Sequence, residues 1–428
     1  MLYTCSCLWR SWHPRVCRGF ILSMLLLAGC AQPYITPNRY RGSDIRRIRL
    51  AIEKASTTTH KILIPARNAN GTNIWLLDSA ILVPGNMTII LENCTIQLSD
   101  QCRDNMFRSE NVGTGITDPV RIGNINITGM GHVVLKGANN PRATGDGARE
   151  LSLDPRAEKE KGNWRVSYGS DAGKKGRKQT GDWRNIMILM ACVDGFRLEH
   201  VNIENSHAWA VSFERVRNAD ISGIRIENPE EIDIQGKKVL VSNKDGINLR
   251  HGCKHFRIDD ISGRTGDDFI ALSCLDTGVG GHQNGSLNST MVTSRKWNGP
   301  EDDTEDVVIT NIRCRTEYRG VAIRASDSAG IHDVSIDGLI AMQQGDHTQA
   351  ILIGGAGYGK LSLPGKINHI HAMNIMGGGQ SLILIEAPVV DCYFMNGIYT
   401  GKGDQLIAYH IDRAKTTRII SLNLLRAR

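Results

Sequence analysis

The stretch FRIDDISGRTGDDFIAL, residues 256–272, contains two short apolar runs separated by a polar segment. Both runs alternate and include β-branched residues, which is typical of strands. The step between matching apolar positions, from Ile258 to Leu272, is 14 residues. The glycines and acidic residues between the runs indicate a turn. The stretch therefore predicts two consecutive strands joined by a tight corner.

The same pair of runs recurs through most of the chain, which is typical of a repeat protein. The first runs are FRLEHVNI (196–203), ADISGIRI (219–226), FRIDDISG (256–263), VVITNIRC (307–314) and VSIDGLIA (334–341). The second runs are AWAVSF (208–213), DGINL (245–249), DFIAL (268–272), GVAI (320–323) and AILI (350–353). Among the first four pairs, the step is 14 or 15 residues in three and 28 in the fourth, where EIDIQGKKVLVSN is inserted.

This spacing, without sustained helical periodicity and with 45 glycines for turns, predicts an all-β fold. We expect a single-stranded, right-handed parallel β-helix, in which each coil has a strand, a turn and a second strand before it climbs. A β-sandwich is the structural alternative. Its tight Asn-Gly or Asp-Gly hairpin turns are not what separates the runs. Only 5% of residues are aromatic, which fits a narrow interior filled by Ile, Val and Leu.

One amphipathic helix is predicted at SDIRRIRLAIEKAS, residues 43–56, where Ser43 or Asp44 can cap the helix. Its apolar face consists of Ile45, Ile48, Ala51, Ile52 and Ala55. Such a helix would shield the open end of the first coil, since terminal repeats must be capped. The early strands are then KILIPA (61–66), NMTIILENCTIQL (86–98) and IGNINITG (122–129).

The first 29 residues resemble a signal peptide, with Arg10, Arg15 and Arg18 before an apolar stretch too short to span a bilayer. The sequence Leu-Ala-Gly-Cys at 27–30 resembles the bacterial lipobox, which predicts lipidation of Cys30. Residues 30–42 then form a tether, and we expect an exported outer-membrane lipoprotein whose only membrane contact is its lipid anchor. The alternatives are an ordinary cleaved signal peptide, with a periplasmic or extracellular protein, or a misassigned start.

The formal charge of +7 falls to +4 without the three leader arginines, since residues 1–29 contain no acid. No nucleic-acid module is present, so we expect no nucleic-acid partner. A basic cluster at residues 174–178 lies in a polar insertion near 139–184. This cluster is either a solvated surface loop or an electropositive wall that attracts an anionic polysaccharide.

Seven of the 11 cysteines lie beyond the leader, and none forms a Cys-x-x-Cys pair. We therefore expect no metal site. Cys192, Cys253 and Cys314 are predicted to be small buried hydrophobes. Cys94 and Cys102 can form a local disulfide in an oxidising compartment, and this pairing stays open.

The segments NKDG (243–246) and GDDFIAL (266–272) place Asp245 and Asp268 23 residues apart, which is one turn of the repeat. Neighbouring coils lie about 4.8 Å apart, so carboxylates on one face repel and one of them should hold its proton to higher pH. A protonated acid beside an ionised base is what glycoside hydrolysis requires. Asp267 and Asp268 would point to opposite faces of a regular strand, so both reach one cleft only with a bend at Gly266. The alternative is that these acids only cap turns.

The segment NSHAWAVSFERVRNADISGIRI (205–226) resembles the Asn-Ser-Pro-x-Trp segment of the polygalacturonases, glycoside hydrolase family 28, with His207 in place of the proline. NKDG is similar to the family's Asn-Thr-Asp-Gly, and GDD to its Gly-Asp-Asp. The resemblance runs from about residue 43 to the end and is specific between about 186 and 325. It implies that Asp267 is the general acid and that Asp245 and Asp268 hold and activate the attacking water. It also implies a substrate-binding role for Asn243.

The chain departs from the family in two motifs. The family has Gly-His-Gly on the next coil and Arg-Ile-Lys on the one after. The 51 residues from Leu272 to Ile323 leave room for two coils, which places Ala322 where the family has arginine and Arg324 where it has lysine. We expect Arg324 to bind a substrate carboxylate, with Arg319 compensating for the lost arginine. The histidine has one nearby candidate, His282, in a predicted excursion over the cleft at 276–306.

Together these features predict one β-helix domain over residues 43–428. We expect an inverting glycoside hydrolase that needs no cofactor, acts as a monomer and cleaves a pectic polysaccharide, either galacturonan or rhamnogalacturonan. Trp209 shares the column of Asp245 and is either a sugar-stacking platform or a partly buried aromatic. Two alternatives remain: a polysaccharide lyase that holds Ca²⁺ on the three aspartates, and a surface protein that binds glycan without cleaving it.

Overall fold

The computed structural model describes residues 34–140, 183–275, 291–293 and 299–427, apart from 103, 114, 117, 235, 242, 327, 344–347 and 356–361. From Ile35 onward the chain forms a stack of parallel strands, so the predicted parallel β-helix is confirmed. The leader with Cys30, the basic cluster at 174–178 and His282 lie outside the described residues. The predictions about them stay predictions.

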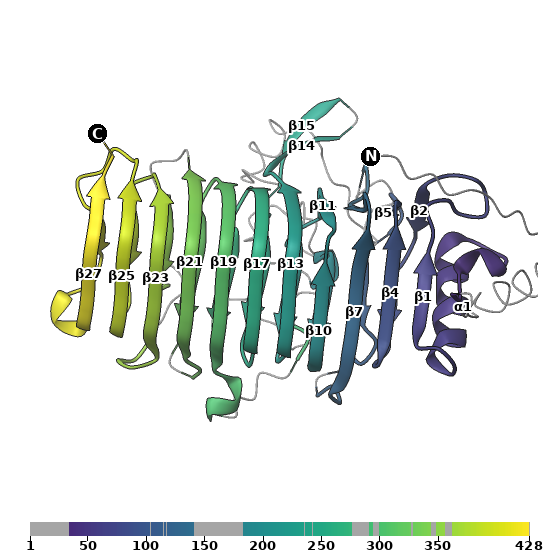
Figure 1. The fold of residues 1–428 in the computed structure, drawn as a ribbon, viewed down its shortest axis with the longest axis horizontal. Coiled ribbons are helices and arrows are strands. Elements are labelled where there is room, and N and C mark those ends of the chain that lie inside the picture. Colours follow the sequence, from purple (N-terminus) through teal and green to yellow (C-terminus); the bar gives the residue numbers. More distant parts are fainter. Residues whose placement is uncertain are drawn as a thin grey trace, which may run out of the picture. The chain divides into compact units, whose positions relative to one another are not determined.

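The strands form two large parallel sheets, each of which receives one strand or two from every coil. The main path of the first sheet is β1 (Lys61–Ile64), β4 (Met87–Glu92), β7 (Ile122–Met130), β10 (Val193–Glu199), β13 (Arg217–Asn228), β17 (Lys254–Thr265), β19 (Thr304–Thr316), β21 (Ile331–Gln343), β23 (Ile367–Gly377), β25 (Val389–Tyr399) and β27 (Thr417–Arg426). Four short strands join its early coils: β2 (Ile74–Leu77), β5 (Thr95–Leu98), β8 (Val134–Lys136) and β11 (Asn202–Glu204). Figure 1 shows the main path side by side in chain order.

The second sheet runs parallel to its own neighbours in the same order along the chain. It contains β3 (Ile81–Val83), β6 (Phe107–Ser109), β9 (Ile188–Ala191), β12 (Val211–Glu214), β16 (Ile247–Arg250), β18 (Ile270–Cys274), β20 (Arg319–Ala325), β22 (Gln349–Ile353), β24 (Ser381–Ile385) and β26 (Ile407–Tyr409). The 13-residue insertion forms a separate antiparallel hairpin, β14 (Glu231–Ile234) with β15 (Lys237–Leu240). The hairpin extends beyond the end of β13 (Figure 1).

The core lies between the two sheets and is built from stacked aliphatic side chains. In the first sheet Ile221, Ile258 and Ile309 are in register and fully buried. In the second sheet Ile247 and Ile270 are in register in the same way. Each such side chain contributes about 1.5–3 kcal/mol by leaving water. Because inward positions alternate with outward ones, this core fixes which side chains face away from it.

The predicted N-terminal helix is confirmed as α1 (Asp44–Ser56), which lies beside β1 (Figure 1). All five residues of its predicted apolar face are buried. The predicted side-chain cap is wrong, because Ser43 occupies the N-cap position without a side-chain hydrogen bond. Asp44 instead accepts hydrogen bonds from the Leu76 backbone N–H at 3.0 Å and from Asn68 Nδ2 at 3.1 Å. The carboxylate therefore ties the helix to the segment around β2.

Four short 3-10 helices complete the described elements: η1 (Pro37–Arg39), η2 (Trp183–Asn185), η3 (Gly299–Asp302) and η5 (Arg413–Lys415). The described cysteines are free and buried, including Cys94 and Cys102, so the disulfide left open is not formed. The predicted burial of Cys192, Cys253 and Cys314 is confirmed. No helix in the described part of the chain is long and apolar enough to cross a membrane.

The prediction of two coils between Leu272 and Ile323 is wrong. Strand β18 pairs directly with β20, with Leu272 opposite Ile323 and Ser273 opposite Arg324. The extra residues belong to an excursion after β18 that returns through η3 to β19. Arg324 therefore lies on the coil next to the acidic corner. By register Ala322 falls on the coil where the family has Gly-His-Gly, and it does not replace the family's arginine.

The Asp44 contacts predict different effects for two neighbouring substitutions. We expect Asp44→Ala to lower the free energy of unfolding by about 1–3 kcal/mol, because it leaves buried donors unsatisfied. Ser43→Ala, the matched control, should change it by less than about 0.5 kcal/mol. Denaturant unfolding of both variants measures the difference. Equal losses would contradict the assignment of the anchoring role to Asp44.

Candidate active site

The outward positions of the second sheet stack into columns, one residue from each coil. One column contains Trp209, Asp245, Asp268 and Arg319, since these residues precede paired positions of β12, β16, β18 and β20 by two. The backbone supports this register, because the Gly246 N–H donates to Asp268 O at 3.0 Å and the Phe269 N–H to Arg319 O at 2.9 Å. The predicted one-coil relation of Asp245 and Asp268 is confirmed.

Asp267 and Asp268 lie in the corner between β17 and β18 rather than within a strand, so both reach the same pocket. Gly266 allows the corner to close, because a Cβ there would lie 2.3 Å from the Glu230 backbone nitrogen. The Thr265 hydroxyl donates to the Asp267 carbonyl at 2.7 Å. The bend predicted at Gly266 is thus present and has a steric reason.

Asp268 is the most strongly ion-paired of these acids. Arg324 Nη1 lies 2.6 Å from Asp268 Oδ2, and the side chains of both residues are 4% exposed. Arg319 Nη1 lies 3.4 Å from Asp268 Oδ1. The Asp268 backbone N–H also donates to Asp267 Oδ1 at 3.0 Å, which links the two carboxyl groups. Asp268 is therefore held by two cations.

The other two acids favour their protonated forms. Burial raises the pKa of Asp267 to about 7, with the charge of Asp268 as the second cause. Burial also raises the pKa of Asp245 well above its usual value, and the charges of Asp267 and Asp268 add to the effect. Arg324 opposes both shifts. The site therefore combines an ion-paired carboxylate with two carboxyl groups that retain protons.

These groups open into one pocket of about 420 Å³. Its lining residues are Trp209, Asn243, Asp245, Asn248, Arg250, Asp267, Asp268, Ser273, Leu275 and Arg324. The structure thus brings together most of the residues predicted for the site. Arg319 contacts Asp268 without itself lining the pocket, and His282 lies outside the described residues.

Trp209 has two environments, so each alternative for it describes part of the ring. It packs against a small apolar cluster on the outer face of the second sheet, which includes Leu189 and Val292. It also lines the pocket, where the Arg250 guanidinium lies 5.2 Å from the ring centroid. The cation–π contact stabilises this pair.

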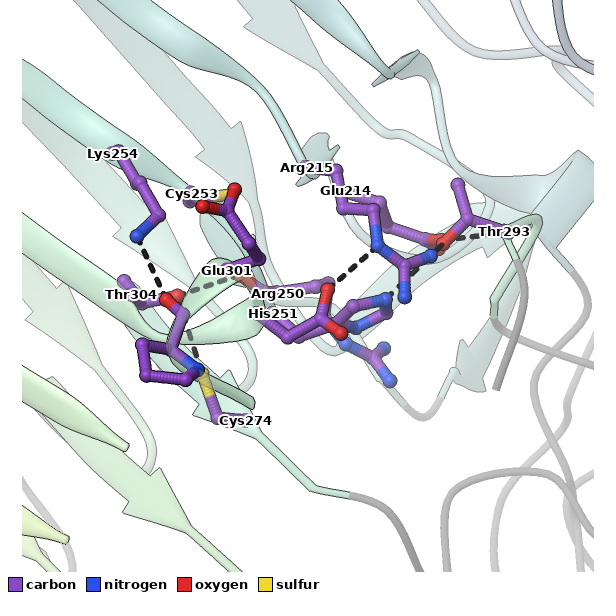
Figure 2. A network of polar contacts seen from close by, with 12 residues as sticks. Glu214, Arg215, Arg250, His251, Cys253, Lys254, Cys274, Thr293, Glu301 and Thr304 are labelled. Atoms are coloured by element: carbon purple, nitrogen blue, oxygen red, sulfur yellow. Dashed lines mark hydrogen bonds and ion pairs between the residues drawn. The ribbon is translucent and has the colours of Figure 1, made fainter. Parts of the chain in front are cut away.

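The described parts of the excursion are tied down beside the pocket. The fully buried Glu214 carboxylate accepts hydrogen bonds from the backbone N–H groups of Val292 and Thr293 and from Thr293 Oγ1 at 2.8 Å. Arg215 donates to Thr293 Oγ1 at 2.6 Å and to Asp302 Oδ1 at 2.7 Å. Figure 2 shows Glu214 and Arg215 converging on Thr293. These contacts hold residues 291–293 over the coil before Asp245.

No histidine among the described residues lines the pocket. His251 is buried behind it, and its Nε2 lies 3.1 Å from Thr293 Oγ1. Since that hydroxyl donates to Glu214, His251 must donate through Nε2, and burial holds its pKa well below the usual value. His207 accepts the Ala138 backbone N–H on Nε2 at 3.0 Å, which indicates a structural role.

Lys244 of the NKDG segment is fully buried, and its ammonium donates to the Ser206 carbonyl. Burial lowers the pKa of this lysine to about 7. The Lys244 carbonyl in turn accepts the backbone N–H groups of Gly266 and Asp267. The residue therefore links the two acidic segments through its backbone.

Sequence reasoning did not single out Arg250, Ser273 or Glu214. Each occupies an outward position of a strand that had been identified. The register that placed Asp245 and Asp268 in one column also places these three residues in another. Continuing each predicted strand for one or two residues would have found them.

Comparison with known proteins supports the predicted resemblance. Residues 159–287 match the family described as glycosyl hydrolases family 28. The matched region contains Asp245, Asp267 and Asp268. The sequence matches no curated protein.

Solved structures resemble this chain in fold at low sequence identity. The hyperthermoactive exopolygalacturonase of Thermotoga maritima is 14% identical, with a TM-score of 0.51 over 92% of this chain and 91% of that one. The polygalacturonase of Erwinia carotovora ssp. carotovora is 13% identical, with a TM-score of 0.50 over 92% and 96%. A tailspike mutant of E. coli bacteriophage HK620, in complex with a pentasaccharide, is 12% identical, with a TM-score of 0.55 over 92% and 67%.

The raised pKa of Asp267 predicts a pH-dependent stability effect. A raised folded-state pKa contributes stability that is present below about pH 3.9 and is lost as the pH rises to about 7. Asparagine mimics the protonated acid and should avoid this loss. We expect Asp267→Asn to raise the free energy of unfolding by about 2 kcal/mol at pH 8 and by little at pH 4.

Denaturant unfolding at the two pH values measures this effect. Asp260→Asn is the matched control, because Asp260 is exposed on β17. The assignment is overturned if Asp267→Asn responds to pH in the same way as this control.

Proposed function

We propose that this chain, which carries a glycoside hydrolase family 28 region, hydrolyses glycosidic bonds in an acidic polysaccharide with inversion of configuration. The observation that carries the proposal is the contrast within the aspartate trio. Asp268 is ion-paired with Arg324 and Arg319, whereas Asp267 holds its proton up to about pH 7. Pectic chains, galacturonan or rhamnogalacturonan, are the substrate class that this family resemblance favours.

Each acid has a separate task in the proposed reaction. Asp267 gives its proton to the glycosidic oxygen as the bond from that oxygen to the anomeric carbon breaks. A water on the opposite face forms the new bond to the anomeric carbon and loses its proton to Asp268. Asp245 binds and orients that water. Solvent then returns a proton to Asp267 and removes one from Asp268.

The arginines bound to Asp268 suit it to the role of base. They hold the carboxylate in one orientation and keep it from sharing the proton of Asp267. This is a different role for Arg324 from the substrate contact expected from sequence alone. The arginine now serves the reacting acid through a direct ion pair, and its position on the pocket wall leaves it beside the substrate as well.

The calcium-dependent lyase alternative requires several carboxylates to converge on one ion. Among the described residues, no group of three or more His, Cys, Asp or Glu side chains has the arrangement of a metal site. The trio is instead compensated by arginines and protons. The hydrolase reading therefore accounts for more of the geometry, and the alternatives become outcomes of the test.

Activity assays on a panel of pectic, rhamnogalacturonan and host glycans test the proposal. We expect the wild type to release new reducing ends, at a rate that falls as the pH rises through about 7 because Asp267 loses its proton. Asp267→Asn and Asp268→Asn should each lower the rate by about 10²–10⁴-fold. Asp260→Asn, on the exposed face of β17, should leave it unchanged.

Two results would contradict the proposal. An unsaturated, ultraviolet-absorbing product that disappears with EDTA would show a lyase. Glycan binding that survives in both variants, with no sugar released by the wild type from the whole panel, would show a protein that only binds.

We also propose that the protein is exported and anchored to the outer membrane by acyl chains on Cys30. The support is the sequence Leu-Ala-Gly-Cys at 27–30 after a short apolar stretch. In a bacterium that lipidates such proteins, the wild type should partition into detergent and Cys30→Ser into the aqueous phase. Aqueous partition of both proteins would show that the leader is cleaved as an ordinary signal peptide or is not used.

A further inference from the structure

A second column of the outer face runs beside the acidic one and contains two arginines. Arg250 on β16 pairs in register with Ser273 on β18, and Ser273 pairs with Arg324 on β20. Strands in a sheet lie about 4.8 Å apart, so the backbones of the two arginines are about 10 Å apart, with a serine between them. Glu214 occupies the same column one coil before Arg250, because Phe213 pairs with Leu249.

The three side chains line the same pocket as the aspartates. Arg250 is 1% exposed, Arg324 3% and Ser273 9%. The guanidinium forks match a carboxylate, and such pairs are stronger where water is excluded. A serine hydroxyl adds a donor between them. The column therefore presents donors to an anion at the wall of the pocket.

Arg250 is held in position from two sides. Its guanidinium lies 5.2 Å from the centroid of the Trp209 ring. Glu214 lies behind it in the column and places a carboxylate in the buried part of the wall, where the backbone of residues 292 and 293 fixes that carboxylate. A side chain held in this way loses little entropy when it binds a ligand.

The charges around the pocket also favour an anion. Three arginines, Arg250, Arg319 and Arg324, face the three aspartates. Asp268 is ionised in its pairs with two of them, whereas burial favours the neutral forms of Asp245 and Asp267. Glu214 supplies the remaining negative charge behind Arg250. Below about pH 7 the pocket wall thus carries more positive than negative charge.

We propose that Arg250, Ser273 and Arg324 form a carboxylate subsite that selects an acidic sugar residue of the substrate. Glu214 is a positioning residue for Arg250. The proposal rests on the proposed function in one respect, since it takes the ligand to be a sugar of the polysaccharide that the pocket cleaves. It assigns specificity to Arg250 and Ser273, on the coils of the catalytic aspartates themselves.

Binding measurements on the full-length protein test the subsite. The ligands are a galacturonate trisaccharide and the same trisaccharide with its carboxyl groups reduced to alcohols, titrated by calorimetry at pH 5.5. We expect the wild type to bind the acidic ligand at least about tenfold more tightly, a difference of about 1.4 kcal/mol. Arg250→Gln should remove most of this preference and leave binding of the reduced ligand within about threefold.

Three further variants sharpen the test. Ser273→Ala should weaken acidic binding by a smaller factor, and Arg250→Lys should restore part of what Arg250→Gln loses, because it keeps the charge without the fork. Arg257→Gln, on the exposed face of β17, is the control and should change nothing. If Arg250→Gln fails to fold, the wild-type preference and its reduction in Ser273→Ala decide the question.

The subsite is overturned if the wild type binds both ligands equally, or if Arg250→Gln weakens both by the same factor. Its failure is distinguishable from failure of the proposed function. A protein that prefers the acidic ligand through Arg250 but releases no sugar would keep the subsite and refute the hydrolase. A protein that cleaves both ligands equally well, with or without Arg250, would keep the hydrolase and refute the subsite.

Discussion

The parallel register between coils is the constraint on which the site depends. Equivalent positions of neighbouring coils lie about 4.8 Å apart, so outward side chains stack into columns whether or not their charges are compatible. Asp245 and Asp268 are neighbours in such a column, and Asp267 joins them through the corner after Gly266. Three buried carboxylates cannot all carry charge at this spacing. The protein answers with arginines at Asp268 and with retained protons at Asp245 and Asp267.

Much of the fold was predictable because the repeat reports directly on the core. The runs at 196–203 and 208–213 and their later copies became strands of the two sheets, since their apolar alternation is what fills a coil. The helix at Asp44–Ser56 followed from its period for the same reason. Its anchoring did not follow, because the partners of Asp44 are Asn68 and Leu76, which only the folded chain brings close.

The coil count after Leu272 went wrong because length alone does not distinguish a coil from an excursion. The structure shows one coil, with Leu272 opposite Ile323, and the surplus chain tied to Glu214 and Arg215. Neither anchor had a motif, since a buried glutamate that accepts backbone N–H groups is defined by its three-dimensional neighbours. The acidic trio was found because it carried a resemblance. Arg250 carried none, and only the register of β16 with β18 gives it a place beside the acids.

The central claim is that a proton-holding Asp267 and an arginine-held Asp268 act from opposite sides of a glycosidic bond. The stereochemistry of the first product tests it most directly. Proton NMR of the reaction with an α-linked galacturonan, followed before mutarotation, should show the β-anomer at the new reducing end, since water attacks opposite the leaving oxygen. The α-anomer as first product would contradict the account, because it would require a covalent intermediate on one of the carboxylates.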